Sequence, residues 1–353
     1  METFCLKTKI ISGPGSISEL GQLGCRRVLL VADPYFQKTD VPDRLMAATN
    51  AEFAFFYEVK PDPTVTLAAK GTALVQEFKP DTGVALGGGS AMDCAKAMVY
   101  FSGQTIRFVA IPTTSGSGSE VTDFAILTHE GVKHPLVDPA LTPDVAILDG
   151  NLLSALPKSL IADAGYDIVA HAVESYVATG AGAISRSLAG DAFACAFRLL
   201  PASFAGSTAV RQQLHDAATM AGIAFSQSGL GLCHALSHAL GGQLHLPHGR
   251  CNAILLPAVV EANSCANAGY AALSRAAGLG GSVDTLAVRN LRNALLQLRK
   301  ELRLPQTLSQ AGIEPRQVQV ASIVKAALDD PCCATNPQRP TAQLVEKILR
   351  QVM

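Results

Sequence analysis

Histidines crowd one short stretch of this 353-residue chain. Four of its eight histidines, His234, His238, His245 and His248, lie in GLCHALSHALGGQLHLPHGR. Imidazole is a common ligand for divalent transition metals. His234 and His238 are four residues apart on a predicted helix that Gly241-Gly242 ends, with the other two on the turn beyond. Spacing alone favours His234 with His238 as ligands. A lone helical histidine is ordinarily a core or surface residue, but this crowding favours a metal site.

A second candidate half-site lies in DAGYDIVAHAVESY. Asp167 and His171 are four apart on a helical pattern, so their side chains share one face. One carboxylate and one imidazole at this spacing suit a divalent metal. An Asp–His pair that is only hydrogen-bonded on a helix face explains the spacing equally well when the pair is taken alone.

A glycine-rich turn follows the predicted strand TGVALGGG. Gly87, Gly88 and Gly89 allow a bulky anion to approach the backbone, and the helix predicted to start at Ser90 offers free N–H groups. A pyrophosphate site is one interpretation. The other is a tight strand-to-helix turn in which Ser90 is the N-cap and Asp93 completes a capping box.

Two further polar segments end predicted strands. PTTSGSGSEVT, residues 112–122, alternates hydroxyls with glycines, and two such loops at the ends of parallel strands make one crevice. Asp33 ends an earlier strand and precedes the glycines, whereas the common dinucleotide fingerprint places its ribose-binding acid about 20 residues after them. Asp33 could accept from an adenosine ribose, or it could be an ordinary turn residue.

The elements that must position these residues change in character along the chain. Up to about residue 155, apolar β-branched runs alternate with helical stretches, which predicts a parallel sheet covered on both faces. From Pro157 onward, alanine- and leucine-rich helical patterns dominate. We therefore predict an α/β domain over 1–155 and a helical domain over 156–353. The predicted strands are Arg26 to Asp33, Thr82 to Gly89, Ile106 to Thr114 and Pro143 to Asp149.

Composition narrows the class of protein. With 48% hydrophobic and 16% charged residues, the composition is typical of a globular protein with a large buried core. The net charge of −1 provides no excess of positive charge to bind nucleic acid. No signal-peptide pattern and no run of about 18 apolar residues is evident, which predicts a cytoplasmic protein without a membrane partner. Nine cysteines without C-x-x-C spacing indicate core residues in a reducing compartment rather than disulfides.

Four segments in this order resemble the signatures of the iron-containing (group III) alcohol dehydrogenases: GGGSAMDCAKA, IPTTSGSGSEVT, DAGYDIVAHAVESY and GLCHALSHALGGQLHLPHGRCNAILLP. The likeness covers essentially the whole chain. Within the family, FSQSGLGLCHALSHALGGQLHLPHG and ALDDPCCATNPQRPTA are most similar to the propanol and ethanol dehydrogenases of bacterial propanediol- and ethanolamine-type microcompartments. The resemblance implies a Rossmann-like dinucleotide-binding domain, an all-α C-terminal domain and a metal between them.

The resemblance also implies roles for individual residues. The metal ligands become Asp167, His171, His234 and His248, which overrules the choice by spacing and leaves His238 as a proton-handling or orienting group. The implied cofactor residues are Asp33, which favours NAD over NADP, with Gly88, Gly89, Ser90, Asp93, Thr113, Thr114, Ser117 and Lys133. Phe225 and Cys332 match positions that line the substrate pocket in relatives, although ordinary core residues would fit both positions.

The resulting expectation is a metal-dependent, NAD(H)-linked dehydrogenase for short-chain primary alcohols and aldehydes such as propanol and propanal or ethanol and acetaldehyde. Fe²⁺ is the metal that the family implies, although the ligand set also accepts Zn²⁺. A homodimer or larger homo-oligomer, possible microcompartment enzymes as partners and a location inside a microcompartment are further expectations. Two alternatives are a metal- and NAD-dependent lyase related to dehydroquinate synthases and a catalytically silent nucleotide-binding assembly component.

Overall fold

The computed structural model describes residues 3–130, 132–263, 266 and 268–353. The chain divides into two compact units. One, here called the α/β unit, comprises Leu6–Leu156 together with Arg211–Gly222. The other, the helical unit, comprises Met1–Cys5, Pro157–Val210 and Ile223–Met353. A single boundary near residue 155 does not describe this division, because the first two-thirds of one later helix belongs with the α/β unit.

The α/β unit is built on a six-stranded parallel sheet with the strand order β1-β8-β5-β4-β2-β3. The predicted runs correspond to β2 (Arg27–Ala32), β4 (Thr82–Gly87), β5 (Arg107–Pro112) and β8 (Val145–Leu148). The edge strands β1 (Lys9–Ser12) and β3 (Glu52–Phe56) were not predicted, and neither was the antiparallel hairpin of β6 (Phe124–His129) and β7 (Val132–Val137).

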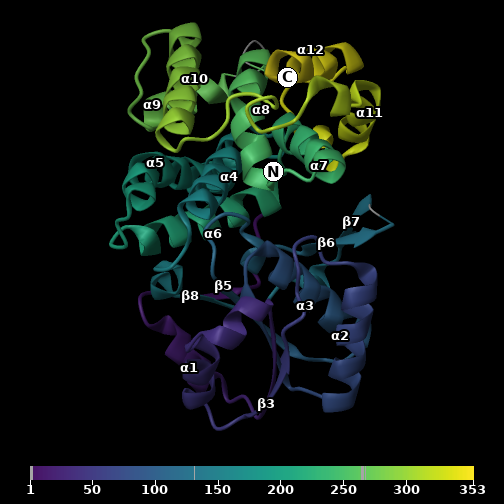
Figure 1. Cartoon of the computed structure of the whole chain (residues 1–353). Helices are drawn as coiled ribbons and strands as arrows, with labels where there is room; N and C mark the ends of the chain where they lie inside the picture. The colour runs from purple at the N-terminus through teal and green to yellow at the C-terminus, as the bar shows by residue number, and fades with distance from the viewer. Residues whose placement is uncertain (1–2, 131, 264–265, 267) are drawn as a thin grey trace. The chain divides into compact units, whose positions relative to one another are not determined.

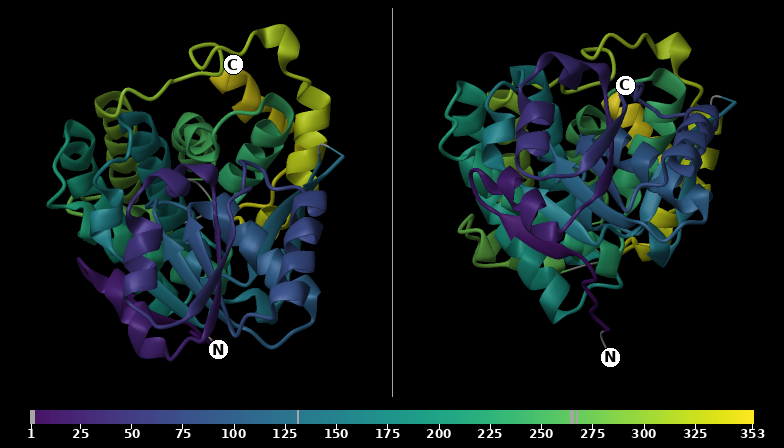
Figure 2. Two further views of the ribbon diagram at one scale, coloured as in Figure 1. Left: turned by 60° about the horizontal axis from the view of Figure 1, so that its bottom comes forward. Right: turned by 90° about the horizontal axis from the view of Figure 1, so that it is seen from below.

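Alternate residues of the central strands enter two separate cores, as expected for a sheet covered on both faces. Val84 and Leu86 of β4 pack with the 3-10 helix η1 (Ser16–Leu23) and α1 (Val41–Ala47). Ala85 faces the opposite core, which is closed by α2 (Val65–Phe78) and α3 (Gly89–Ser102). The strands lie between these helices in Figure 1 and are seen from two other directions in Figure 2. The remaining short 3-10 helices of this unit are η2 (Pro34–Lys38), η3 (Ser119–Val121), η4 (Pro139–Leu141) and η5 (Gly150–Leu153).

The helical unit is organised around α4 (Lys158–Val177), which is buried at nearly every position from Ile161 onward. Helices α5 (Ala183–Ala205), α7 (Leu232–Leu244), α8 (His248–Asn263) and α9 (Gly269–Ala276) pack against it. The remaining helices are α6 (Arg211–Ser228), which belongs to both units, α10 (Asp284–Glu301), η6 (Pro315–Gln317), α11 (Val320–Asp329), η7 (Pro331–Thr335) and α12 (Ala342–Val352).

One helix among the described residues, α5, is long and apolar enough to cross a membrane by length and composition alone. Its buried residues include Ala189, Ala192, Phe193 and Ala196, which follow the spacing of one helix face. The helix packs against α4. A core helix in a globular protein meets the same criterion.

Two local predictions about the histidine segment were wrong. Gly241-Gly242 does not end the helix, because α7 continues to Leu244, and His245 is its C-cap in the left-handed region at φ 54°. His248 does not lie on a turn; it is the first residue of α8.

Candidate metal and cofactor sites

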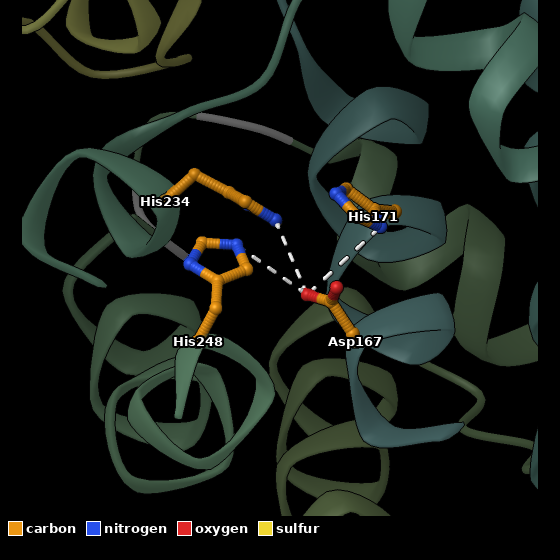
Figure 3. Close-up of side chains that lie close together, drawn as sticks. All are labelled: Asp167, His171, His234 and His248. Carbon is orange, nitrogen blue, oxygen red and sulfur yellow. Dashed lines mark ion pairs between the residues drawn. The ribbon is translucent and has the colours of Figure 1, made fainter. Parts of the chain in front are cut away.

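Four side chains from three helices of the helical unit converge on one point. Asp167 and His171 come from α4, His234 from α7 and His248 from α8. One ligand atom of each lies within 4.8 Å of those of the other three. Oδ1 of Asp167 is 3.5 Å from His248 Nε2, 3.8 Å from His234 Nε2 and 4.0 Å from His171 Nδ1. Figure 3 shows the three imidazoles around this carboxylate.

Close contact between helices brings His248 into this group. A Cβ on Gly249 would lie 1.9 Å from the carbonyl oxygen of Asp163, so only glycine lets the first turn of α8 approach α4. Next to it, the Arg250 guanidinium makes two hydrogen bonds with the Asp163 carboxylate, at 3.1 and 2.8 Å. A bidentate ion pair fixes orientation as well as distance. The start of α8 is thus held against the helix that carries Asp167.

The position of the Asn252 side-chain amide indicates that these candidate ligand atoms suit a cation. Its Nδ2 donates to Asp167 Oδ1 at 2.7 Å and lies 3.3 Å from Nε2 of both His234 and His248. Its own Oδ1 accepts from the Ser237 hydroxyl, which fixes the amide orientation. Three of the four candidate ligand atoms, Asp167 Oδ1, His234 Nε2 and His248 Nε2, therefore lie around one electropositive group. One carboxylate and three imidazoles are a donor set that suits Fe²⁺ or Zn²⁺.

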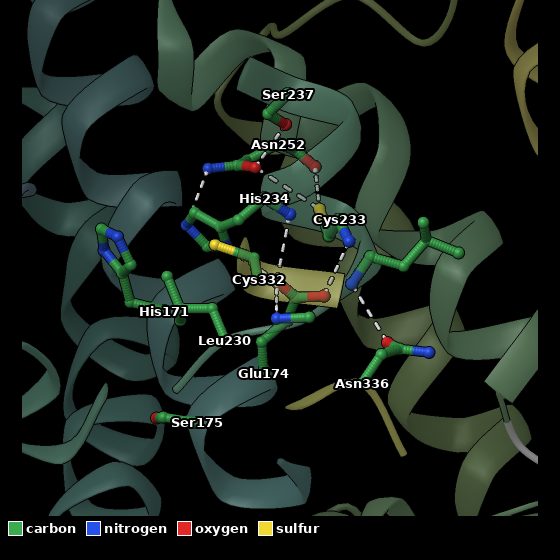
Figure 4. Close-up of polar contacts among 12 residues, drawn as sticks. His171, Glu174, Ser175, Leu230, Cys233, His234, Ser237, Asn252, Cys332 and Asn336 are labelled. Atoms are coloured by element: carbon green, nitrogen blue, oxygen red, sulfur yellow. Dashed lines mark hydrogen bonds and ion pairs between the residues drawn. The ribbon is translucent and has the colours of Figure 1, made fainter. Parts of the chain in front are cut away.

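Glu174 orients one of these ligands and caps its helix. Its carboxylate accepts from the backbone N–H groups of Gly231, Cys233 and His234 at 3.1, 2.7 and 3.1 Å, and Nδ1 of His234 lies 2.7 Å from Oε2. The neighbouring Leu232 N–H donates to Asn336. Figure 4 shows these contacts at the N-terminus of α7. An anion at this end of a helix satisfies otherwise unpaired donors and is favoured by the helix dipole.

Tight packing around the Glu174 carboxylate affects both the neighbouring backbone and the pKa of this group. A Cβ on Gly231 would lie 2.7 Å from Glu174 Oε1, so any other residue here would have to displace the Glu174 carboxylate. Burial raises the pKa of Glu174 to about 7, although the backbone hydrogen bonds oppose the rise. Burial and the neighbouring imidazoles hold the pKa of His234 well below its usual value. His234 is therefore a neutral imidazole, which is the form that binds metal.

His238 stands beside the four ligands. Its ring is stacked on that of His248, with centroids 5.2 Å apart and planes at 15°. Its Nδ1 donates to Asp330 Oδ2 at 2.8 Å. This hydrogen bond places the ring proton on Nδ1, so Nε2 has a lone pair that can accept a proton. Phe225 is buried and stacked on His171 at 4.5 Å. Its predicted role in a substrate pocket, and that of Cys332, stay predictions.

The α/β unit brings most of the predicted cofactor residues to one edge of its sheet. Strands β2, β4 and β5 are neighbours, so Asp33, the glycine turn and Thr113 follow adjacent strand ends. A Cβ on Gly88 would lie 3.1 Å from Thr114 Oγ1, and one on Gly89 would lie 3.4 Å from Ser117 Oγ. Two polar loops are thus in contact, as the crevice prediction requires.

The capping interpretation of the glycine turn was wrong. Helix α3 begins at Gly89, its N-cap is Gly88, and no side chain caps it. Asp93 instead accepts from the Ser119 hydroxyl at 3.1 Å and from the backbone of Ile126. Burial raises the pKa of Asp93 to about 6. Asp93 therefore connects α3 to the polar loop of residues 112–122 through the hydrogen bond with Ser119.

Two of the predicted cofactor residues, Asp33 and Lys133, have protein partners. Oδ1 of Asp33 accepts from Tyr35 N at 2.8 Å and caps η2, while Oδ2 faces the turn at Gly87. Asp33 is therefore a turn residue with one oxygen near the glycines. Lys133, on β7, is paired with Asp62 at 2.6 Å. Its predicted contact with the cofactor ribose stays a prediction.

The sequence analysis did not identify the residues that hold the loop of residues 112–122 in place through hydrogen bonds. Lys96 is buried and donates to the Thr122 carbonyl and hydroxyl and to the Phe124 carbonyl, at 2.8, 3.0 and 2.9 Å. Thr219 of α6 donates to Glu120 at 2.6 Å. Lys96 lies inside the quoted segment GGGSAMDCAKA, and a lysine in a largely apolar helix was the available signal.

Comparison with known proteins identifies the family. Residues 7–150 match the iron-containing alcohol dehydrogenase model, and residues 161–353 match the C-terminal model of the Fe-containing alcohol dehydrogenase family. The chain belongs to the iron-containing alcohol dehydrogenases. It is therefore a metal-dependent alcohol dehydrogenase, and family membership implies binding of NAD(H) and a metal. The lyase and silent-protein alternatives are not favoured.

Relatives that match over the full length of the chain support this family assignment. The chain is 37% identical to the 1-propanol dehydrogenase PduQ of Citrobacter freundii, with 100% of both chains covered. It is 33% identical to an NADPH-dependent butanol dehydrogenase of Clostridium saccharobutylicum, covering 100% of this chain and 98% of that one. A solved 1,3-propanediol oxidoreductase matches with a TM-score of 0.95 and 30% identity over the whole of both chains. The predicted Rossmann-like domain followed by a helical domain is confirmed.

Proposed function

We propose that this protein interconverts short-chain primary alcohols and aldehydes, such as propanol and propanal or ethanol and acetaldehyde, with NAD(H) as the redox partner and Fe²⁺ as the metal. The observation that carries the proposal is the convergence of Asp167, His171, His234 and His248 within 4.8 Å. The full-length likeness to a 1-propanol dehydrogenase supports the short substrate.

The bound groups would supply complementary chemistry. A divalent ion provides Lewis-acid polarisation of a hydroxyl or carbonyl oxygen, and a nicotinamide accepts or donates hydride. Asp167, His171, His234 and His248 would hold the ion, with Glu174 fixing the orientation of His234 through Nδ1. The loops at Gly88 and Thr114 would bind the cofactor phosphates.

His238 is the proposed proton-handling group. Asp330 holds its Nδ1 at 2.8 Å, which fixes the ring orientation and leaves Nε2 to accept the hydroxyl proton during oxidation and return it during reduction. The side chain of His238 is 30% exposed, so the proton can exchange with solvent. The homo-oligomeric state and a location inside a microcompartment stay predictions.

The rate of NADH oxidation with propanal tests this proposal, using protein purified without oxygen and loaded with Fe²⁺. We expect a rate that chelation abolishes and that Fe²⁺ restores. Zn²⁺-loaded protein and NADPH are the matched comparisons for metal and cofactor. No rate from protein that binds both metal and NADH would exclude short aldehydes as substrates.

A further inference from the structure

A second group of metal-binding side chains adjoins the four ligands. His238 on α7, Asp330 at the start of η7 and Cys332 within η7 each offer one ligand atom, all within 4.8 Å of one another. Helix α7 packs against η7, which places the imidazole beside the carboxylate and the thiol. This group shares no residue with the Asp–His₃ site, and it contains a sulfur atom, which that site lacks.

We propose that His238, Asp330 and Cys332 form a second, inhibitory metal site that binds Zn²⁺. Zinc accepts nitrogen, oxygen and sulfur ligands, and three protein ligands plus one open position are a common arrangement for it. Bond lengths of about 2.0 Å to nitrogen and 2.3 Å to sulfur separate ligand atoms by roughly 3 to 4 Å. The three ligand atoms lie within 4.8 Å of one another, which is close to these separations.

The surroundings of this second site are already organised for a cation. One oxygen of Asp330 accepts from His238 Nδ1, and the other accepts from the backbone N–H of Cys332 at 2.9 Å. Burial alone would raise the pKa of Asp330, but these hydrogen bonds outweigh it and keep the pKa below its usual value. The Asp330 carboxylate is therefore anionic. The Cys332 thiol lies close to this negative charge and is also affected by the charge of Glu174.

The thiol of Cys332 must lose its proton to bind a metal. Burial raises its pKa, and the charges of Asp330 and Glu174 raise it further. The same negative charges attract a dication, which would displace the thiol proton to solvent. The adjacent Cys333 differs, because its thiol donates to the carbonyl oxygen of Ala327 at 2.9 Å. Cys333 is therefore the matched control.

Occupation of this site would stop turnover. Zn²⁺ bound to His238 withdraws the imidazole from proton transfer, a consequence that rests on the proposed function. The binding site itself does not rest on it, since the thiolate gives a signature that needs no catalysis. The two can therefore be tested separately.

Co²⁺ absorption is the direct test. A thiolate bound to Co²⁺ produces a charge-transfer band in the near ultraviolet, whereas a site of carboxylate and imidazoles does not. We expect wild-type protein to bind two equivalents of Co²⁺ and to show the band. His248→Ala and Cys333→Ala should keep the band, and Cys332→Ser and Asp330→Asn should lose or strongly weaken it. A wild-type protein that binds Co²⁺ without the band, or a band lost with Cys333→Ala, would overturn the proposal.

Inhibition supplies the second measurement. Zn²⁺ added to Fe²⁺-loaded enzyme should inhibit NADH oxidation, and Cys332→Ser should raise the concentration for half inhibition by at least about tenfold relative to Cys333→Ala. Equal inhibition of the two variants would contradict the inhibitory role. An inactive wild-type enzyme that still shows the Co²⁺ band would refute the proposed function while leaving the second site established.

Discussion

His234 Nδ1 lies 2.7 Å from Glu174 Oε2, and the same carboxylate accepts from the N–H groups of Cys233 and His234 in the first turn of the helix that carries them. The contact spans 60 residues of sequence and joins α4 to α7. It directs Nε2 of His234 towards Asp167, at 3.8 Å. One buried carboxylate therefore holds both the start of the helix and the orientation of the His234 ring.

Glu174→Ala should weaken metal binding by about 10- to 100-fold, the range for loss of a group that orients a metal ligand. It should also destabilise the protein, because buried N–H donors would lose their acceptor. Glu174→Gln can still accept these hydrogen bonds, so its loss of affinity should be smaller. Competition with a chromophoric chelator measures the affinity. Equal affinity in wild type and Glu174→Ala would contradict the orienting role.

The two histidines that face each other, His238 and His248, should give opposite phenotypes. His248→Ala should empty the metal site, since it removes one of four ligands. His238→Ala should retain the metal and lose on the order of 10²-fold in turnover, the lower range for an acid–base group. Metal content by elemental analysis and the NADH oxidation rate separate the two. Loss of metal from His238→Ala, with metal retained in His248→Ala, would restore the ligand pair that spacing alone favours.

Asp33 should discriminate against the 2′-phosphate of NADP through its charge. Asp33→Asn keeps an acceptor for Tyr35 N but removes the negative charge, so the preference for NADH over NADPH in kcat/KM should narrow by about tenfold or more. Asp33→Gly removes both the charge and the cap. An unchanged preference in both variants would show that Asp33 serves only the turn. The comparison matters because one full-length relative is an NADPH-dependent butanol dehydrogenase.

Much of the scaffold could be predicted because its signals are local. The four central strands are apolar β-branched runs, and Asp167 with His171 share a helix face through their spacing alone. Edge strands such as β1 and β3 carry weaker patterns. The return of Arg211–Gly222 to the α/β unit depends on contacts of Glu120 with Thr219 and of Ser115 with His215, which no local pattern encodes.

The details of the metal site depend on contacts that are distant in sequence. His234 and His238 have equivalent helical spacing, but their partners differ, because Nδ1 of His234 contacts Glu174 and Nδ1 of His238 contacts Asp330. Gly241-Gly242 was expected to end the helix, yet packing of α7 against α8 and α11 overrides this local preference. His248 was expected on a turn, but the close approach at Gly249 fixes it at a helix start.

Asp93 should make stability depend on pH in a defined direction. Its pKa is raised from 3.8 to about 6 in the folded protein. Between these values the folded state binds more protons than the unfolded state, so the free energy of unfolding falls as pH rises. Asp93→Asn lacks this titration but can still accept a hydrogen bond from Ser119. A shift of about 2 pKa units corresponds to up to about 3 kcal/mol.

The stability difference between Asp93→Asn and wild type should therefore move in favour of the variant between about pH 4 and pH 6, and should level off above that. Urea denaturation of both metal-free proteins across this range measures it. Taking the difference between the two proteins cancels the titration of the histidines and other carboxylates that they share. A difference that does not change with pH would mean that Asp93 ionises at an ordinary pKa. The hydrogen bond from Ser119 would then compensate fully for burial, and the loop of residues 112–122 would be held to α3 by a carboxylate that is charged over most of this range.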